Sequence, residues 1–304
     1  MSKVRSSSQL TNPPLLVHHA ARRGHGCPPN SPAAVRACLE AAARAIEIDI
    51  SPLADGRFAL LHGPLLDAET TGRGPVSGRT AAQVRALHYT ASDAPVGLLA
   101  EALDLLAAHP HPVELQLDLK PNIFLSDAVL ARLAADLRPF RGRVRVTSPA
   151  DWALRRLRAI APELALGFDP LLYLELDEEG PRDPRLPPFR RGAYGYRDDH
   201  PLAGRRWGTA SDYWAARAEV LWAQAPWEGV WYIRARLLAR ALDDGFDWIA
   251  ELHRRGAAVD AWTLDADRPE DVALARRLLA HGLDRITTND APALASALGG
   301  AVLY

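Results

Sequence analysis

The segment from residue 46 to residue 62 combines two carboxylates and a histidine at spacings that suit metal binding or acid–base chemistry. Glu47 and Asp49 lie two residues apart in a run that alternates apolar and acidic side chains. Side chains two apart on a β-strand point to the same face, at a separation of roughly 7 Å. Both carboxylates are therefore expected on one face, and the isoleucines of the run on the other.

A turn after this strand brings the histidine back toward the carboxylates. Asp55-Gly56 between two extended segments is a strong signal for a two-residue hairpin loop. Pairing around that loop places His62 opposite Asp49 and on the same face as Glu47. A surface hairpin with one solvated face would show the same alternation, so the wider fold must decide between a site and an exposed edge.

Strand and helix patterns alternate along the chain. Eight short apolar runs read as strands, at residues 15–19, 46–50, 113–120, 143–148, 164–168, 230–234, 258–264 and 284–289. Repeated strand–helix units predict a parallel sheet, and eight units in a chain of this length predict an α/β fold of the closed (β/α)8 TIM-barrel type. The hairpin is then a small excursion after the second strand. A doubly wound sheet is the alternative, but no G-x-G-x-x-G follows the first strand.

One stretch, residues 170–229, interrupts the alternation. It is rich in Pro, Gly, Arg, Trp and Tyr, and it is too long for a usual loop between a strand and a helix. We interpret it as an insertion on the top of the barrel that is partly helical near 210–223. The sequence thus predicts an N-terminal extension at residues 1–14 and a single barrel domain at residues 15–304 that includes the insertion.

The composition is that of an ordinary globular protein, with 48% hydrophobic and 24% charged residues. A net charge of −1 gives no electrostatic argument for a nucleic-acid partner. The first residues lack the apolar run of a signal peptide, and no segment approaches the ~18 apolar residues of a membrane span. A cytoplasmic protein is therefore expected.

The carboxyl ends of the strands carry the chemistry of a TIM barrel. Six ionisable side chains from three neighbouring strands are expected to meet there: His19, Glu47, Asp49, His62, Asp118 and Lys120. Burying several carboxylates together is costly unless a cation compensates them. Three carboxylates are hard oxygen donors, which suit Mg²⁺ or Ca²⁺. The set predicts a divalent cation at Glu47, Asp49 and Asp118, whereas a purely structural interpretation would pair Lys120 with Asp118.

A series of ordered motifs extends this set. They are His19, Pro-Pro-Asn-Ser at 28–31, Glu47-Ile48-Asp49, Asp55-Gly56, His62, Thr70-Thr71-Gly72-Arg73-Gly74, Asp118-Leu119-Lys120, Trp262-Thr263 and Thr288-Asn289. In these motifs the chain resembles the glycerophosphodiester phosphodiesterase family of metal-dependent barrel enzymes. The resemblance covers roughly residues 15–168 and 230–298, and the spacing from Asn30 to His62 matches without a gap. It leaves the insertion uncovered.

The chain departs from the family pattern at three places. The usual Arg after the first histidine is absent, and Arg22 or Arg23 is the candidate for the missing phosphate contact. The usual Asp after the second histidine is Gly63, and the third metal carboxylate is Asp118 where the family has Glu. The last two features are similar to the related sphingomyelinase D and phospholipase D-like branch. The apolar run before the first histidine favours His19 over its neighbour His18.

The resemblance implies a metal-dependent phosphodiesterase that hydrolyses glycerophosphodiesters to an alcohol and glycerol phosphate. It implies that a divalent cation, Mg²⁺ or Ca²⁺, is held by the three carboxylates, and that Lys120, Arg22 or Arg23, and Trp262 contact the substrate. His19 and His62 would be the general acid and base of a reaction that passes through a cyclic phosphate. The sequence leaves open which histidine is the acid.

Two other functions fit parts of the sequence. A sphingomyelinase D-like enzyme would use the same residues on a lysophospholipid-like substrate and stop at the cyclic phosphate. The aromatic residues of the insertion and its flanks would then contact a headgroup or a membrane surface, although packing under a long loop explains them equally: Trp207, Trp214, Trp222, Trp227, Trp231, Tyr194, Tyr196, Tyr213 and Tyr232. The other possible function is that of a non-catalytic barrel that binds a phosphate ligand or a partner protein.

Overall fold

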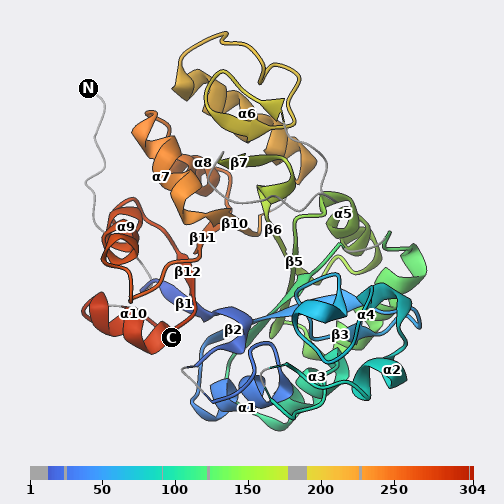
Figure 1. Ribbon diagram of the computed structural model, residues 1–304. Helices are drawn as coiled ribbons and strands as arrows, with labels where there is room; N and C mark the ends of the chain where they lie inside the picture. The colour runs from blue at the N-terminus through green and yellow to red at the C-terminus, as the bar shows by residue number, and fades with distance from the viewer. Residues whose placement is uncertain are drawn as a thin grey trace.

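The computed structural model describes residues 13–23, 26–90, 92–121, 124–176, 190–225, 228–300 and 302–304. Within these residues, eight parallel strands lie around a centre and helices surround them, as Figure 1 shows. The predicted α/β TIM barrel is confirmed. Residues 1–12 of the predicted extension lie outside the described part of the chain, and the division into domains stays a prediction.

The barrel strands follow one another in chain order around the ring. They are β1 (Leu15–His18), β2 (Ala45–Pro52), β4 (Glu114–Leu119), β5 (Val144–Ser148), β6 (Ala165–Phe168), β10 (Val230–Arg234), β11 (Ala258–Trp262) and β12 (Arg285–Thr288). The ring closes because β1 pairs with β12 along its length and with β2 at His18 and Ile46. All carboxyl ends therefore meet at one mouth.

The interior of the barrel is polar. On β4 the odd-numbered leucines belong to the hydrophobic core, and the polar side chains between them turn inward. An ion pair between Glu114 of β4 and Arg285 of β12 joins strands that are not neighbours, so it crosses the interior. Arg145 of β5 lies 2.9 Å from the same carboxylate. TIM barrels usually fill this space with branched aliphatic side chains, whereas here a charged layer lies beneath the mouth.

Asp260 of β11 is a fully buried carboxyl group in this interior, and it gives a first prediction. Its Oδ1 accepts a hydrogen bond from Thr287, whereas its Oδ2 has no hydrogen-bond partner in the described chain. Burial raises the pKa of Asp260 to about 7, although Thr287 and Arg285 oppose the shift and Glu114 adds to it. The folded state thus keeps a proton that the unfolded chain releases near pH 4, so stability falls as the pH rises from about 4 to about 7.

Asp260→Asn should remove this penalty. The variant is expected to be more stable than the wild type at pH 8, by up to roughly 4 kcal/mol, with a much smaller difference at pH 5. Denaturant unfolding of both proteins at the two pH values measures the difference. An equal difference at pH 5 and pH 8 would contradict a carboxyl group that is protonated in the folded state.

Helices flank the strands on the outside of the barrel. They are α1 (Pro32–Glu40), α2 (Ala81–Arg85), α3 (Leu99–Ala108), α4 (Asp127–Leu137), α5 (Asp151–Ile160), α6 (Ala210–Gln224), α7 (Ala235–Asp243), α8 (Trp248–Arg254), α9 (Pro269–Ala280) and α10 (Ala291–Ala297). Short 3₁₀ turns lie at η1 (His19–Ala21), η2 (Leu66–Ala68), η3 (Val76–Gly78), η4 (Arg138–Phe140) and η5 (Pro170–Leu172). Among the described residues, none of the helices combines the length and the hydropathy that a bilayer crossing requires.

The hairpin after β2 forms, but its predicted register is wrong by one residue. β3 (Phe58–Ala59) pairs with β2 so that Ser51 lies opposite Ala59, and this register, continued, puts residue 61 opposite Asp49. The loop has three residues because Gly56, with φ of 73°, adds a left-handed position after the turn. His62 follows the end of β3 and still reaches the mouth, where it lines the same cavity as Asp49.

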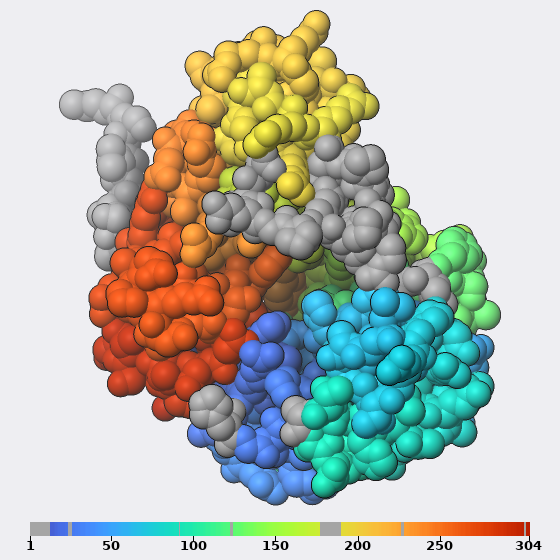
Figure 2. Space-filling model, in the orientation of Figure 1, coloured from blue at the N-terminus to red at the C-terminus, as the bar shows by residue number. Residues whose placement is uncertain are grey.

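The described parts of the insertion form a small lobe, seen in yellow at the top of Figure 2. In it β7 (Leu174–Leu176), β9 (Tyr196–Asp198) and β8 (Arg190–Arg191) form an antiparallel sheet that is followed by α6. Tyr196 stacks on Tyr213, and Trp214 contacts Trp248 of α8. All four side chains are almost completely buried. These contacts support packing as the role of these aromatic residues, whereas Trp227 lies outside the described residues.

Candidate active site

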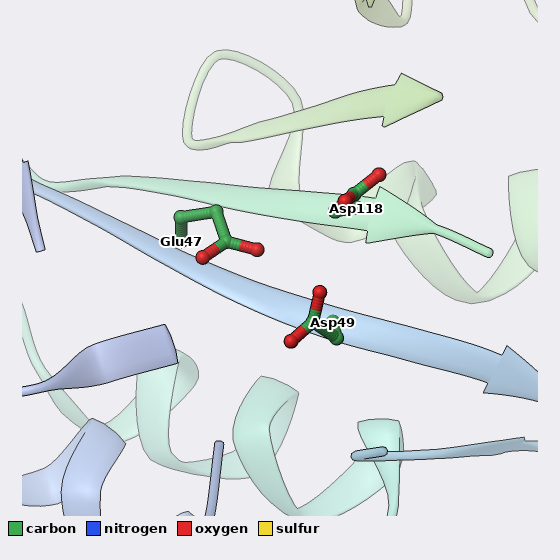
Figure 3. Close-up of side chains that lie close together, drawn as sticks. All are labelled: Glu47, Asp49 and Asp118. Atoms are coloured by element: carbon green, nitrogen blue, oxygen red, sulfur yellow. The ribbon is translucent and has the colours of Figure 1, made fainter. Parts of the chain in front are cut away.

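Three carboxylates meet at the carboxyl ends of β2 and β4. Glu47 and Asp49 come from β2, Asp118 comes from β4, and Asp49 lies opposite Asp118 in the parallel register. One oxygen atom of each carboxylate lies within 4.8 Å of the other two. Figure 3 shows the three side chains on their two strands. The residues predicted as metal ligands are thus brought together by the alternation of the two strands.

Lys120 places its ammonium group between two of these carboxylates. Its Nζ lies 2.6 Å from Asp49 Oδ1 and 2.6 Å from Asp118 Oδ2. Burial alone would lower the pKa of Lys120, but the neighbouring carboxylates outweigh burial and raise the pKa. Burial would likewise raise the pKa of Asp49, whereas attraction to Lys120 lowers it overall. The lysine is therefore charged, and it pairs with both acids rather than with Asp118 alone.

Glu47 is the carboxylate that Lys120 does not contact by an ion pair. It is 7% exposed, and its Oε2 accepts a hydrogen bond of 2.7 Å from the N–H of Ala20. Burial, followed by repulsion from Asp49 and Asp118, raises its pKa well above the ordinary value. One lysine does not balance three carboxylates, so the donor set has an excess of negative charge. Such a set fits a divalent cation that prefers oxygen ligands.

Asn30 explains why the Pro-Pro-Asn-Ser motif belongs to the site. Its side-chain oxygen accepts a 2.8 Å hydrogen bond from the N–H of Asp49, and its Nδ2 donates to the Asp49 carbonyl oxygen. Asn30 itself has a left-handed φ of 58°, and Tyr89 donates a hydrogen bond to its carbonyl oxygen. The motif therefore fixes the main chain of Asp49 without using the Asp49 carboxylate.

The two adjacent histidines have different surroundings. His18 ends β1, is fully buried, and lies with Nδ1 3.0 Å from the carbonyl oxygen of Arg22. His19 begins η1 and lines the mouth of the barrel. Left-handed φ values at Ala20 and Ala21 turn the chain away after His19. The structure thus presents His19 to the site, as the apolar run before it predicts.

Asn289 and Asp265 form a chain of hydrogen bonds that ends at the His19 ring, a contact that sequence reasoning missed. Asn289 Oδ1 lies 2.8 Å from His19 Nδ1, and Asn289 donates from Nδ2 to Asp265 Oδ2 at 2.7 Å. Arg22 also donates to Asn289 Oδ1, at 3.0 Å. Because Oδ1 acts as the acceptor, His19 carries its proton on Nδ1, and its Nε2 is left without a proton. The Thr288-Asn289 motif was the signal, but only the fold shows its partner.

Asn289→Asp gives a prediction about this arrangement. An aspartate can accept a hydrogen bond from His19 but cannot donate one to Asp265, and it places two carboxylates side by side. We expect the substitution to lower kcat by about 10-fold or more with a small change in KM, because His19 is misplaced rather than lost. Steady-state kinetics measure the two constants. A change confined to KM would show that Asn289 serves substrate binding instead.

Two adjoining cavities of about 330 and 230 Å³ form the mouth, and both are lined by His19, Asp49 and His62. Lys120 and Trp262 line the smaller cavity, and Arg22 lines the larger one. Arg23 is exposed and lines neither. Of the two arginines predicted as phosphate contacts, the structure therefore brings Arg22 to the site.

Asp169 and Tyr232 also line the smaller cavity. The sequence did not indicate Asp169, and it indicated Tyr232 only as a possible headgroup contact or packing residue. Asp169 follows the end of β6, and burial raises its pKa well above the ordinary value. Its place directly after a predicted strand was a signal for a residue at the mouth. The Tyr232 ring lies so close to Gly167 that a Cβ there would be 2.4 Å from a ring carbon. A glycine on β6 therefore makes room for the tyrosine, which no sequence motif indicates.

The chain is similar to known proteins over 94% of its length in fold and over about half its length in sequence. Residues 22–170 match the model of the Glycerophosphoryl diester phosphodiesterase family. A curated protein of Mycobacterium tuberculosis, described as "Probable glycerophosphodiester phosphodiesterase 1", is 30% identical over 182 residues. That alignment covers 52% of this chain and 66% of the relative, so the chain spans just under two thirds of the relative's length.

Two solved structures show the same fold. A glycerophosphodiester phosphodiesterase from Parabacteroides distasonis superposes with a TM-score of 0.64 at 14% identity, covering 94% of this chain and 98% of its own. A phosphodiesterase from Oleispira antarctica, solved in complex with the product sn-glycerol-3-phosphate, gives a TM-score of 0.61 at 17% identity, covering 94% and 97%. At these identities the structural likeness establishes the barrel and leaves the chemistry to the residues.

Proposed function

Because the chain belongs to the Glycerophosphoryl diester phosphodiesterase family through residues 22–170, we propose that it hydrolyses glycerophosphodiesters to an alcohol and glycerol phosphate. The observation that carries the proposal is one mouth that holds three carboxylates, a charged lysine and two histidines. The glycerol phosphate bound as product in the Oleispira antarctica phosphodiesterase supports a small glycerophosphodiester substrate for this chain as well.

A divalent cation, Mg²⁺ or Ca²⁺, would be held by Glu47, Asp49 and Asp118. When bound, it supplies positive charge and Lewis acidity to the phosphate group. Lys120, charged and buried between the acids, adds a second positive group at the same place. Arg22 lies at the edge of the mouth, where it can meet a phosphoryl oxygen. Trp262 lines the wall of the smaller cavity and would pack against the substrate.

His19 and His62 supply the proton transfers. One imidazole takes the proton of the glycerol 2-hydroxyl as that oxygen attacks phosphorus, and the other gives a proton to the departing alcohol oxygen. A bond from oxygen to phosphorus forms as the bond to the alcohol breaks, which gives a cyclic phosphate. Water then opens the ring with the roles of the histidines reversed. The fixed Nδ1 proton of His19 supports this role, because its Nε2 is left to exchange protons.

A sphingomyelinase D-like reaction that stops at the cyclic phosphate is the second candidate. Gly63 after His62 and Asp118 as the third carboxylate favour it. The burial of Tyr196, Tyr213 and Trp214 argues against a headgroup contact by these side chains.

Phosphorus NMR of the products tests both candidates. The protein is incubated with a water-soluble glycerophosphodiester, or with a lysophospholipid, in Mg²⁺, Ca²⁺ or a chelator. Glycerol phosphate and free alcohol, formed only with the cation, support the proposed function. A cyclic phosphate that accumulates supports the second candidate. No turnover of either substrate, with the cation bound, would contradict both and favour a barrel that only binds phosphate ligands.

A further inference from the structure

The two histidines are held in different ways. The ring of His19 is fixed through Asn289. The side chain of His62 is exposed, and among the described residues its ring has an electrostatic attraction to Asp49 but no hydrogen bond that would fix its orientation. Because a general acid or base must be placed closely against the reacting atoms, the position of His62 depends on its main chain. The main chain at His62, just beyond the end of β3, must therefore be held by other residues.

The carboxylate of Glu69 holds the main chain at His62. Its Oε2 accepts a hydrogen bond of 3.2 Å from the N–H of His62, and its Oε1 accepts one of 2.5 Å from the N–H of Gly63. On the other side of His62, the Ser51 hydroxyl donates to the carbonyl oxygen of Leu61 at 2.8 Å. A carboxylate that accepts two adjacent N–H groups fixes their orientation and therefore the direction in which the side chain between them leaves the chain.

Hydrogen bonds of the surrounding segment hold the main chain of Glu69. Its N–H donates to the carbonyl oxygen of Leu66, and its carbonyl oxygen accepts a hydrogen bond of 3.0 Å from Thr90. The following residue, Thr70, is buried, and its hydroxyl donates to Leu66 as well. Thr70 also pairs with Tyr89 in an isolated antiparallel β-bridge, and the Tyr89 hydroxyl donates a hydrogen bond to the carbonyl oxygen of Asn30. The carboxylate therefore has a defined place relative to the metal-binding end of β2.

Gly63 completes the arrangement by leaving space. Its φ lies outside the left-handed range, so the backbone conformation does not require glycine. A Cβ at this position would instead lie 3.0 Å from Glu69 Oε1. A side chain at 63 would displace the carboxylate, and an aspartate would also set two negative charges in contact. The departure from the family pattern at Gly63 thus has a partner in this chain, Glu69, six residues later in sequence.

We propose that Glu69 is a positioning residue for His62, and that Gly63 and Glu69 act as a pair that replaces the aspartate expected after the second histidine. This rests on the proposed catalytic role of His62. It concerns the placement of the imidazole and not the binding of the cation or the phosphate. The expected signature is a loss of kcat without a loss of affinity for substrate or cation.

Glu69→Gln tests the proposal, because an amide has one oxygen for two N–H donors and its NH₂ group faces the second. We expect kcat on a water-soluble glycerophosphodiester to fall about 10-fold or more, with KM and the cation concentration for half activity unchanged. Asp67→Asn is the matched control, because Asp67 also binds a loop N–H, that of Gly74, but does not contact His62. It should leave kcat within about twofold, which separates positioning from general support of the loop.

A double substitution decides whether Glu69 acts through His62. In a His62→Ala background, Glu69→Gln should have no further effect on kcat. If the two losses multiply, or if Glu69→Gln alone keeps full kcat, the proposal is wrong. If His62→Ala is as active as the wild type, the assigned role of His62 fails instead, and this outcome is distinct from the others.

Gly63→Ala gives a second route that leaves Glu69 in place. The added Cβ should displace Glu69 Oε1 and lower kcat, whereas in a Glu69→Ala background the same change should be neutral. A Gly63→Ala variant with full kcat would overturn the pairing of the two residues. Thermal unfolding of each variant shows that the comparison is made on folded protein.

Discussion

Asp49→Asn should nearly abolish phosphodiester hydrolysis. Asp49 is central to the carboxylate cluster, since it lies opposite Asp118 and bonds Lys120 at 2.6 Å. An amide is a weaker ligand for a hard cation and leaves Lys120 with one carboxylate instead of two. Loss of a residue that merely supports a metal ligand costs about 10- to 100-fold, so loss of a ligand is expected to cost at least about 10²-fold in kcat/KM. Assays across a range of Mg²⁺ and Ca²⁺ concentrations measure it.

The fold should survive this substitution, because Asn30 holds Asp49 through main-chain atoms that do not change. Asp136→Asn on the exposed face of α4 is the control for removing a carboxylate, and it should leave both activity and cation dependence intact. In the wild type, a chelator should remove activity and added cation should restore it. Full turnover of Asp49→Asn, or of the wild type in chelator, would contradict the metal site.

The barrel and the carboxylate cluster could be predicted because both follow from the alternation of side chains along strands. Glu47 and Asp49 share a face by the period of two alone, and Asp118 joins them once β2 and β4 are neighbours in a parallel sheet. These predictions need no knowledge of loop conformation, which is why they agree with the structure.

The features that could not be predicted from the sequence depend on local backbone conformation or on contacts between residues that are distant in sequence. The left-handed residue Gly56 lengthens the hairpin loop by one and shifts its register, which the Asp-Gly pair alone does not reveal. Likewise the helical pattern that follows β10 and continues to His253 forms two helices, α7 and α8, with Gly245 at a φ of 85° between them. In both places a glycine with positive φ changes the chain direction where the apolar pattern continues.

The supporting residues of the two histidines were hidden for a different reason. Asn289 reaches His19 across 270 residues of sequence, and only closure of β12 onto β1 makes them neighbours. Glu69 is near His62 in sequence, but it lies in a loop whose path depends on the buried Thr70 and Tyr89. A carboxylate or amide that acts through a hydrogen bond to another residue has no spacing rule of its own, so its role appears only when the contact is seen.

The largest effects apart from the metal ligands are expected at the histidines. His19→Ala and His62→Ala should each lower kcat by about 10²-fold or more, because each removes a proton-transfer group. KM and cation affinity should change little, since neither side chain is a proposed ligand. A phosphodiester with an activated leaving group sharpens the comparison. The histidine that protonates the departing alcohol should matter much less for that substrate, whereas the base should remain necessary.

His18→Ala is the control that tests the assignment of the first histidine. His18 is fully buried and contacts the carbonyl oxygen of Arg22, so its loss should lower the free energy of unfolding. The kcat of the folded protein should stay close to that of the wild type, because the side chain doesn't line the mouth of the barrel. Kinetics normalised to folded protein, with denaturant unfolding of each variant, separate the two effects. If His18→Ala abolishes turnover of folded protein while His19→Ala retains it, the catalytic residue at the end of β1 is His18, and the role assigned here to Asn289 fails with it.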